Sequence, residues 1–142
     1  MTGTTTDLVL YRLKRAKDTL HEVDDLIRLG YYQTTVNRLY YACFYAISAL
    51  FVQNNIKTRT HSGVRQMFGQ YFIQTGVISK ELGKYYSTLY EKRITGDYDD
   101  FIDIDRETVE GLLEPATQMI NAIEKILIDK ISDDCLKITP NY

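Results

Sequence analysis

The chain has no tryptophan, only two prolines and only two cysteines among its 142 residues. Cys43 lies in an apolar stretch and Cys135 near the carboxyl end, so they do not resemble the disulfide framework of a small secreted domain. Together with two scattered histidines they also lack the spacing of a zinc site, which needs about four ligands. The composition therefore predicts a reduced, cytoplasmic protein that holds no metal and no other cofactor.

Strong charge of either sign and long apolar runs are also missing. The formal net charge is −2, so contact with RNA would have to be local, and no basic patch with interleaved aromatic residues is visible. No apolar run approaches the roughly 18 residues of a membrane span, and the amino-terminal MTGTTTD lacks the apolar region of a secretory signal. The spacing shows neither a glycine-rich phosphate loop nor a nucleophile beside a base, so it predicts no catalytic mechanism.

Apolar residues recur at helical spacing over most of the chain. Asp7, Thr60, Ser79 and Asp105 are expected to cap the starts of helices, and Gly30 to end the first helix in a left-handed turn. The expected helices cover residues 7–29, about 32–53, 60 to near 76, 79 to the TGDYDD segment, and 105 onward. This pattern predicts an all-α, antiparallel bundle of four to five helices, with a domain at residues 1–131 and a tail at 132–142.

Tyrosine is abundant, with 12 in the chain. Several tyrosines exceed what one apolar stripe per helix requires, namely Tyr41, Tyr45, Tyr85, Tyr86 and Tyr90. Tyrosine suits surfaces that are half buried and half hydrated, such as dimer interfaces. We therefore expect a homodimer, the alternative being rings that wrap a small core with their hydroxyl groups in water.

Aspartates crowd the segment after residue 96. When the segment is counted as a calcium loop from Asp97, Ile102 stands where a glycine is needed and Thr108 where a bidentate glutamate is needed. We therefore expect no metal site here and assign Asp105 to capping a helix. The five aspartates are Asp97, Asp99, Asp100, Asp103 and Asp105.

Arg93 falls in helical register with Tyr86 and Leu89, so its side chain should point toward neighbouring helices. A partly buried guanidinium needs an anionic or carbonyl partner. Two interpretations are open. One is an ion pair with Asp97 that fixes the end of the helix, which we favour, and the other is a guanidinium held ready for a phosphate.

Two further groups are candidate binding residues. Asn37, Tyr41 and Tyr45 share one helix face, and Arg38 follows Asn37. An intrahelical or inter-subunit hydrogen-bond ladder is favoured over ligand binding there. His61 stands in the first turn of a helix, where backbone donors could hold an anion. A neutral, hydrogen-bonded His61 is the favoured interpretation, because the helix dipole disfavours a protonated imidazole at that end.

Three separated stretches resemble the HEPN superfamily: GYYQTTVNRLYYACFYAISALF, KTRTHSGV and FIQTGVISKELGKYYSTLYEKRITGDYDDF. The similarity is to a small uncharacterised prokaryotic branch with the motifs NR-YYA-F, K-THSG and R--GDY. The resemblance implies a dimeric, cytoplasmic helical bundle, often encoded beside a minimal nucleotidyltransferase as a toxin–antitoxin or defence pair. Many such proteins are metal-independent ribonucleases that use an arginine and a histidine spaced R-x4-6-H, which meet at the dimer interface.

The resemblance places Arg93 at the arginine of the family, but the histidine is missing. Tyr98, Asp99 and Asp100 occupy the positions where it would be required, and the usually polar residue after the arginine is Ile94. Histidine suits proton exchange near neutral pH, whereas tyrosine, with a pKa near 10, is a poor base. We therefore lean away from enzymatic activity.

Three functions are consistent with these residues. The first is a ribonuclease with altered machinery that recruits His61, if the fold brings it near the arginine. The second is a toxin whose Tyr98 is modified by the partner nucleotidyltransferase. The third, which we favour, is a non-catalytic module that binds a nucleotide, RNA or a protein partner at a phosphate site or dimer cleft formed by Arg93, Asp97, Tyr98, Asn37, Arg38 and Tyr41.

Overall fold

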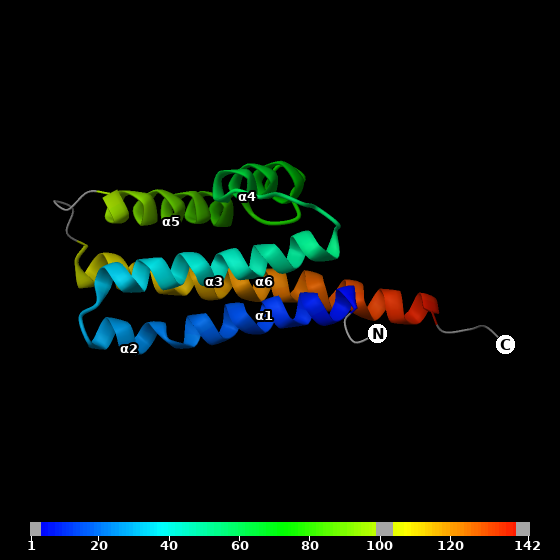
Figure 1. Ribbon diagram of the computed structural model, residues 1–142, viewed down its shortest axis with the longest axis horizontal. Coiled ribbons are helices and arrows are strands. Elements are labelled where there is room, and N and C mark those ends of the chain that lie inside the picture. The colour runs from blue at the N-terminus through cyan, green and yellow to red at the C-terminus, as the bar shows by residue number, and fades with distance from the viewer. Residues whose placement is uncertain (1–3, 99–103, 139–142) are drawn as a thin grey trace.

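The computed structural model describes residues 4–98 and 104–138, without the side chains of residues 95–98 and 136–138. These residues form the all-α bundle that the sequence predicts, built from five helical segments (Figure 1). α1 with α2, and α4 with the π-helix η1, each make up one segment. The helices are α1 (Thr5–His21), α2 (Val23–Arg28), α3 (Tyr32–Gln53), α4 (His61–Phe68), η1 (Gly69–Ile73), α5 (Lys80–Tyr98) and α6 (Arg106–Ile138).

Helix α3 lies at the centre of the bundle, and α1, α5 and α6 pack around it. α1 and α5 run antiparallel to α3, whereas α6 runs parallel to it (Figure 1). This central position follows from the sequence of α3, because apolar and small residues occupy most sides of its middle turns. Its buried residues include Val36, Leu39, Ala42, Cys43, Ala46, Ile47, Ala49 and Leu50.

The first helix differs from the prediction. It begins at Thr5, because Thr4 and not Asp7 is the capping residue. The Thr4 hydroxyl accepts from the Asp7 backbone N–H at 3.0 Å, and the Asp7 carboxylate accepts from the Thr4 backbone N–H at 3.2 Å, a reciprocal pair known as a capping box. The helix is also interrupted at Glu22, so that α2 is a separate element. The chain then turns at Gly30 with φ +83°, as predicted.

The third segment begins where the sequence predicts but does not stay a regular α-helix. Thr60 caps α4 by accepting from the Gly63 backbone N–H at 2.9 Å. After α4 the helix widens into η1, and Gly76 then adopts φ +79°. Ser79 accepts a backbone N–H at 3.3 Å at the start of α5, as predicted. α5 continues to Tyr98, into the segment that was expected to end it.

Asp105 caps α6, as the sequence analysis proposes. Its carboxylate accepts from the Thr108 backbone N–H at 2.8 Å, and hydrogen bonds with Thr108 lower the pKa of Asp105. α6 passes through Pro115 and continues to Ile138, so residues 132–138 of the expected tail are helical. In Figure 1 this end of α6 extends beyond the rest of the bundle.

Candidate functional site

Arg93 lies on the inner face of α5, which it shares with the buried Tyr86 and Leu89, as the helical register predicts. Its guanidinium carbon is 4.7 Å from the centroid of the Tyr40 ring and 5.7 Å from that of the Tyr41 ring. At such distances a guanidinium is attracted by the negative face of an aromatic ring. Two tyrosines of α3 therefore hold the half-buried Arg93 in position.

His61, the first residue of α4, lies against the same two rings. Its Nδ1 is 2.8 Å from the Tyr40 hydroxyl, and its ring centroid is 5.9 Å from that of Tyr41. Tyr86 donates to the Tyr40 hydroxyl at 3.3 Å, so Tyr40 has its own proton to donate to Nδ1, and a neutral imidazole carries its proton on Nε2. The fold thus brings His61 and Arg93 together, which is the condition set by the ribonuclease hypothesis.

Burial and charge keep His61, Tyr40 and Tyr86 neutral beside Arg93. Burial, and secondly the positive charge of Arg93, lower the pKa of His61 below its usual 6.5. Burial raises the pKa of Tyr40 and of Tyr86. At neutral pH the imidazole of His61 and the phenols of Tyr40 and Tyr86 beside the Arg93 guanidinium are therefore neutral.

The lowered pKa of His61 predicts that stability depends on pH. The unfolded chain takes up a proton at His61 near pH 6.5, and the folded chain does so only at lower pH. The free energy of unfolding should therefore decrease as the pH falls below about 6.5, and His61→Gln should lose this part of the decrease. Urea denaturation of both proteins between about pH 5 and pH 7.5 measures the effect. Identical pH profiles would contradict a half-buried, neutral His61.

The turn before α4 explains why a glycine follows closely after His61 in the sequence THSG. A Cβ atom on Gly63 would collide with Thr58 Oγ1 and would lie 2.9 Å from Thr60 Oγ1. Thr60 at the same time caps α4 through the Gly63 backbone N–H. Both threonines therefore pack directly onto the glycine, which fixes the start of α4 and the position of His61.

Two more arginines extend this group of side chains. The guanidinium carbon of Arg15, on α1, lies 4.3 Å from the centroid of the Tyr45 ring. The same guanidinium donates to the Tyr45 hydroxyl at 2.9 Å. Arg65 of α4 lies over the Tyr90 ring at 4.4 Å. The rings of Tyr45 and Tyr90 contact the two rings that hold Arg93, at centroid distances of 6.0 and 6.2 Å. We call this set the arginine–tyrosine cluster: Arg15, Arg65, Arg93, Tyr40, Tyr41, Tyr45 and Tyr90.

The cluster corrects the expectation that the chain has no basic patch with interleaved aromatic residues. Its members come from α1, α3, α4 and α5, so no single stretch of sequence shows it. The feature of the sequence that indicates the cluster is its surplus of tyrosine. Three of these tyrosines, Tyr41, Tyr45 and Tyr90, are half-buried members of the cluster. Tyr85 and Tyr86 lie in the core instead, and the Tyr85 hydroxyl donates to a backbone carbonyl of α6 at 2.6 Å.

The other candidate residues are placed differently. Arg38 forms an ion pair with Glu22, with 3.3 Å between Nε and Oε2, at the junction of α1 and α2 rather than in the cluster. Asn37 is half-buried, one turn before Tyr41 on α3. Outside the described residues lie the side chains of Asp97 and Tyr98 and the whole of Asp99, Asp100 and Asp103.

The chemistry of the cluster suits anions and planar bases. Guanidinium groups donate hydrogen bonds to phosphate and carboxylate oxygens, and aromatic rings stack on bases. Within the described residues, no three His, Cys, Asp or Glu side chains gather closely enough to hold a metal ion. No helix in this part of the chain is long and apolar enough to cross a lipid bilayer.

Comparison with known proteins identifies the family. A profile described as the HEPN domain matches residues 9–126. The chain belongs to the HEPN family. The HEPN domain therefore spans the bundle from α1 into α6, and the resemblance to the superfamily is confirmed.

Related sequences support the same family over most of the chain. A UPF0332 protein of Thermotoga maritima is 36% identical over 122 residues, which cover 86% of this chain and 92% of the relative. A protein of Methanocaldococcus jannaschii named "Putative toxin MJ0142" is 36% identical over 118 residues, which cover 83% of this chain and 80% of the relative. The similarity to these proteins thus extends over most of the HEPN domain.

Proposed function

We propose that this HEPN protein binds single-stranded RNA at the arginine–tyrosine cluster without cutting it. The observation that carries the proposal is Arg93, held half-buried on Tyr40 and Tyr41. These two rings contact the tyrosine rings on which two further arginines lie. Arginine binds phosphate through paired hydrogen bonds, and tyrosine rings stack on bases. Among the cluster's rings, Tyr41, Tyr45 and Tyr90 are half-buried rather than fully buried, so these three are the rings available to bases.

Binding without cleavage is favoured by the state of His61. Its Nδ1 is engaged with the Tyr40 hydroxyl, and a neutral imidazole then carries a proton on Nε2. Neither ring nitrogen is a free base in this arrangement. Attack by a 2′-hydroxyl requires a group that takes up its proton, and no histidine follows Arg93 at the spacing R-x4-6-H.

The family and its relatives suggest the biological setting. A relative over most of the chain is named as a candidate toxin, which supports a role in a toxin–antitoxin or defence pair. In this proposal the protein is a homodimer that works beside a minimal nucleotidyltransferase in the cytoplasm. Each protomer then contributes one arginine–tyrosine cluster to the RNA-binding surface.

Fluorescence anisotropy with a labelled single-stranded RNA tests the proposal. The protein should bind with an affinity that falls as salt rises. Tyr41→Ala should weaken binding by about 5- to 150-fold, because a stacked base contributes roughly 1–3 kcal/mol. Tyr71→Ala is the matched control, since Tyr71 is 47% exposed on η1, outside the cluster. No binding at low salt, or an equal loss in both variants, would contradict the proposal.

A ribonuclease that uses His61 for proton transfer is the second candidate. The observation that favours it is the contact of both His61 and Arg93 with the Tyr40 ring. This activity would cut the labelled RNA, and both His61→Ala and Arg93→Ala would abolish cutting. If the RNA bound to the protein remains intact on a denaturing gel after long incubation, the ribonuclease hypothesis is contradicted and only the binding function remains.

A further inference from the structure

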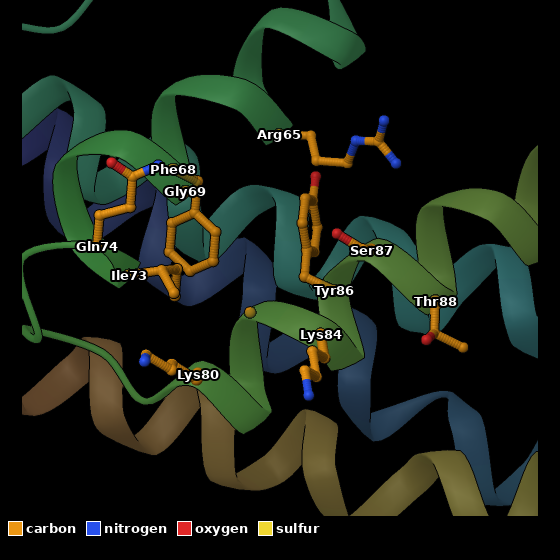
Figure 2. Close-up of a pocket in the computed structure, with 11 residues that line it drawn as sticks. Arg65, Phe68, Gly69, Ile73, Gln74, Lys80, Lys84, Tyr86, Ser87 and Thr88 are labelled. Carbon is orange, nitrogen blue, oxygen red and sulfur yellow. The ribbon is translucent and has the colours of Figure 1, made fainter.

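A groove runs between the α4–η1 segment and α5 (Figure 2). Its volume is about 620 Å³, within the range of ligand sites in proteins. Phe68 and Ile73 line one side and Tyr86 the other, so the lining is mostly apolar. Two glycines shape it: a Cβ on Gly69 would meet no atom within 4 Å, whereas Gly83 packs closely against Ile73.

The rim of the groove is positively charged. Lys80 and Lys84 are exposed and lie one helical turn apart on α5. Neither lysine forms an ion pair with another described residue, and none of the described residues that line the groove is acidic. Arg65, which also lines the groove, adds a third cation. Its Nη1 is 3.7 Å from the Glu91 Oε1. The groove therefore combines an apolar floor with cations spaced along its length.

The aromatic rings of the groove are largely covered. Phe68 is 2% exposed and Tyr86 is 1% exposed, so neither presents an open face on which a base could stack. Apolar contacts in the groove are therefore made mainly with the half-buried Ile73. Such a surface suits aliphatic side chains better than nucleobases.

We propose that this groove binds an acidic, amphipathic segment of a partner protein. An aliphatic side chain of the segment lies over Phe68 and Ile73, in the space left open at Gly69. Carboxylates one helical turn apart pair with Lys80 and Lys84, and this charge complementarity selects an acidic segment. The groove does not contain Arg93, so peptide binding there does not depend on RNA binding at Arg93.

The groove and the cluster share two side chains. Tyr86 lines the groove and donates to the Tyr40 hydroxyl, which in turn bonds to His61 Nδ1. Arg65 lines the groove and lies on the Tyr90 ring of the cluster. A segment that occupies the groove therefore alters the surroundings of His61, which its imidazole NMR signals report.

The test uses a fluorescein-labelled amphipathic peptide made of leucines and glutamates. Its leucines repeat at i, i+4 along one helix face, and its glutamates repeat at the same spacing beside them. The full-length protein should bind it, and the double variant Lys80→Glu with Lys84→Glu should weaken binding at least about tenfold. The matched control is Lys14→Glu with Lys125→Glu, two lysines whose side chains are 75% and 79% exposed on other helices. Both double variants have the same net charge, so the control should bind as the wild type does.

A second pair of variants tests the apolar floor. Gly69→Trp fills the groove from a helical position with φ −59°, and it should also weaken peptide binding at least about tenfold. Gly111→Trp places the same side chain on α6, where a Cβ likewise meets no atom within 4 Å, and should have no effect. If either groove variant unfolds, as circular dichroism would show, the other still decides.

The outcomes separate this site from RNA binding. Arg93→Ala should retain peptide binding, so failure of the cluster proposal leaves the groove proposal intact. No peptide binding by the wild type, or binding that no groove variant weakens, overturns the groove proposal. Loss of RNA binding in the groove variants without loss of peptide binding also overturns it, because the groove would then be a nucleic-acid surface.

Discussion

Replacing Arg93 by alanine should weaken the binding of single-stranded RNA at least about tenfold without loss of helical structure. A hydrogen bond to a charged group contributes roughly 1.5–3 kcal/mol, and about 1.4 kcal/mol corresponds to a factor of ten in affinity. Because Tyr40 and Tyr41 already hold the guanidinium, binding costs little side-chain entropy. Arg93→Lys should recover only part of the affinity, since an ammonium lacks the planar donor pair.

Arg28→Ala is the matched control for this variant. Arg28 lies in α2, its side chain is 72% exposed, and it pairs with Asp25, outside the cluster. Both variants lose one positive charge, so a general effect of net charge would weaken both equally. In Arg93→Ala alone, the slope of log K against log salt should become shallower by about 0.7, as expected for one lost phosphate contact. Equal losses, or none in Arg93→Ala, would contradict a site at Arg93.

Tyr40→Ala should lower the free energy of unfolding by about 3–5 kcal/mol, the range for deleting a large buried aromatic side chain. Tyr40 is fully buried, and its ring stacks on those of Phe44 and Tyr86 at centroid distances of 6.0 and 5.6 Å. Its removal leaves a cavity beneath Arg93 and deprives His61 of its hydrogen-bond partner. The same change should therefore disrupt the cluster.

Tyr40→Phe separates the contribution of the Tyr40 hydroxyl from that of its ring, and Tyr11→Ala serves as the control. Tyr40→Phe keeps the ring and should cost about 1–3 kcal/mol, because the hydrogen bonds with His61 and Tyr86 are lost. Tyr11→Ala removes a tyrosine that is 56% exposed and should stay within about 0.5 kcal/mol of the wild type. Urea denaturation followed by circular dichroism measures all three. A Tyr40→Ala protein as stable as Tyr11→Ala would contradict the placement of this ring.

Local signals were sufficient to predict most helix boundaries. α3 has the predicted bounds because Gly30 adopts a left-handed conformation before it and the apolar pattern ends after Gln53. The predicted start of α1, with Asp7 as the cap, was wrong. Thr4 and Asp7 are both good capping residues, and only their reciprocal hydrogen bonds decide between them. The π-helix η1 was missed, because its i to i+5 hydrogen bonds leave no pattern in the side chains.

The candidate site was predictable only in part, because it is assembled across helices. Register alone placed Arg93 on an inner face, together with Tyr86 and Leu89. The contact of His61 with Tyr40 depends on how α4 crosses α3, which spacing does not reveal. The roles of Arg15 and Arg65 were missed for the same reason, since their tyrosine partners lie on other helices.

The most direct test of RNA binding at the cluster is an NMR titration of isotope-labelled protein with single-stranded RNA. Binding at Arg93 predicts that the largest chemical-shift changes occur at the Arg93 Nε–H and at His61 and Tyr41, while α2 stays unchanged. The RNA should be recovered intact from the sample. Unchanged Arg93 and His61 signals on binding, with the largest shifts on another surface, would contradict the proposed site.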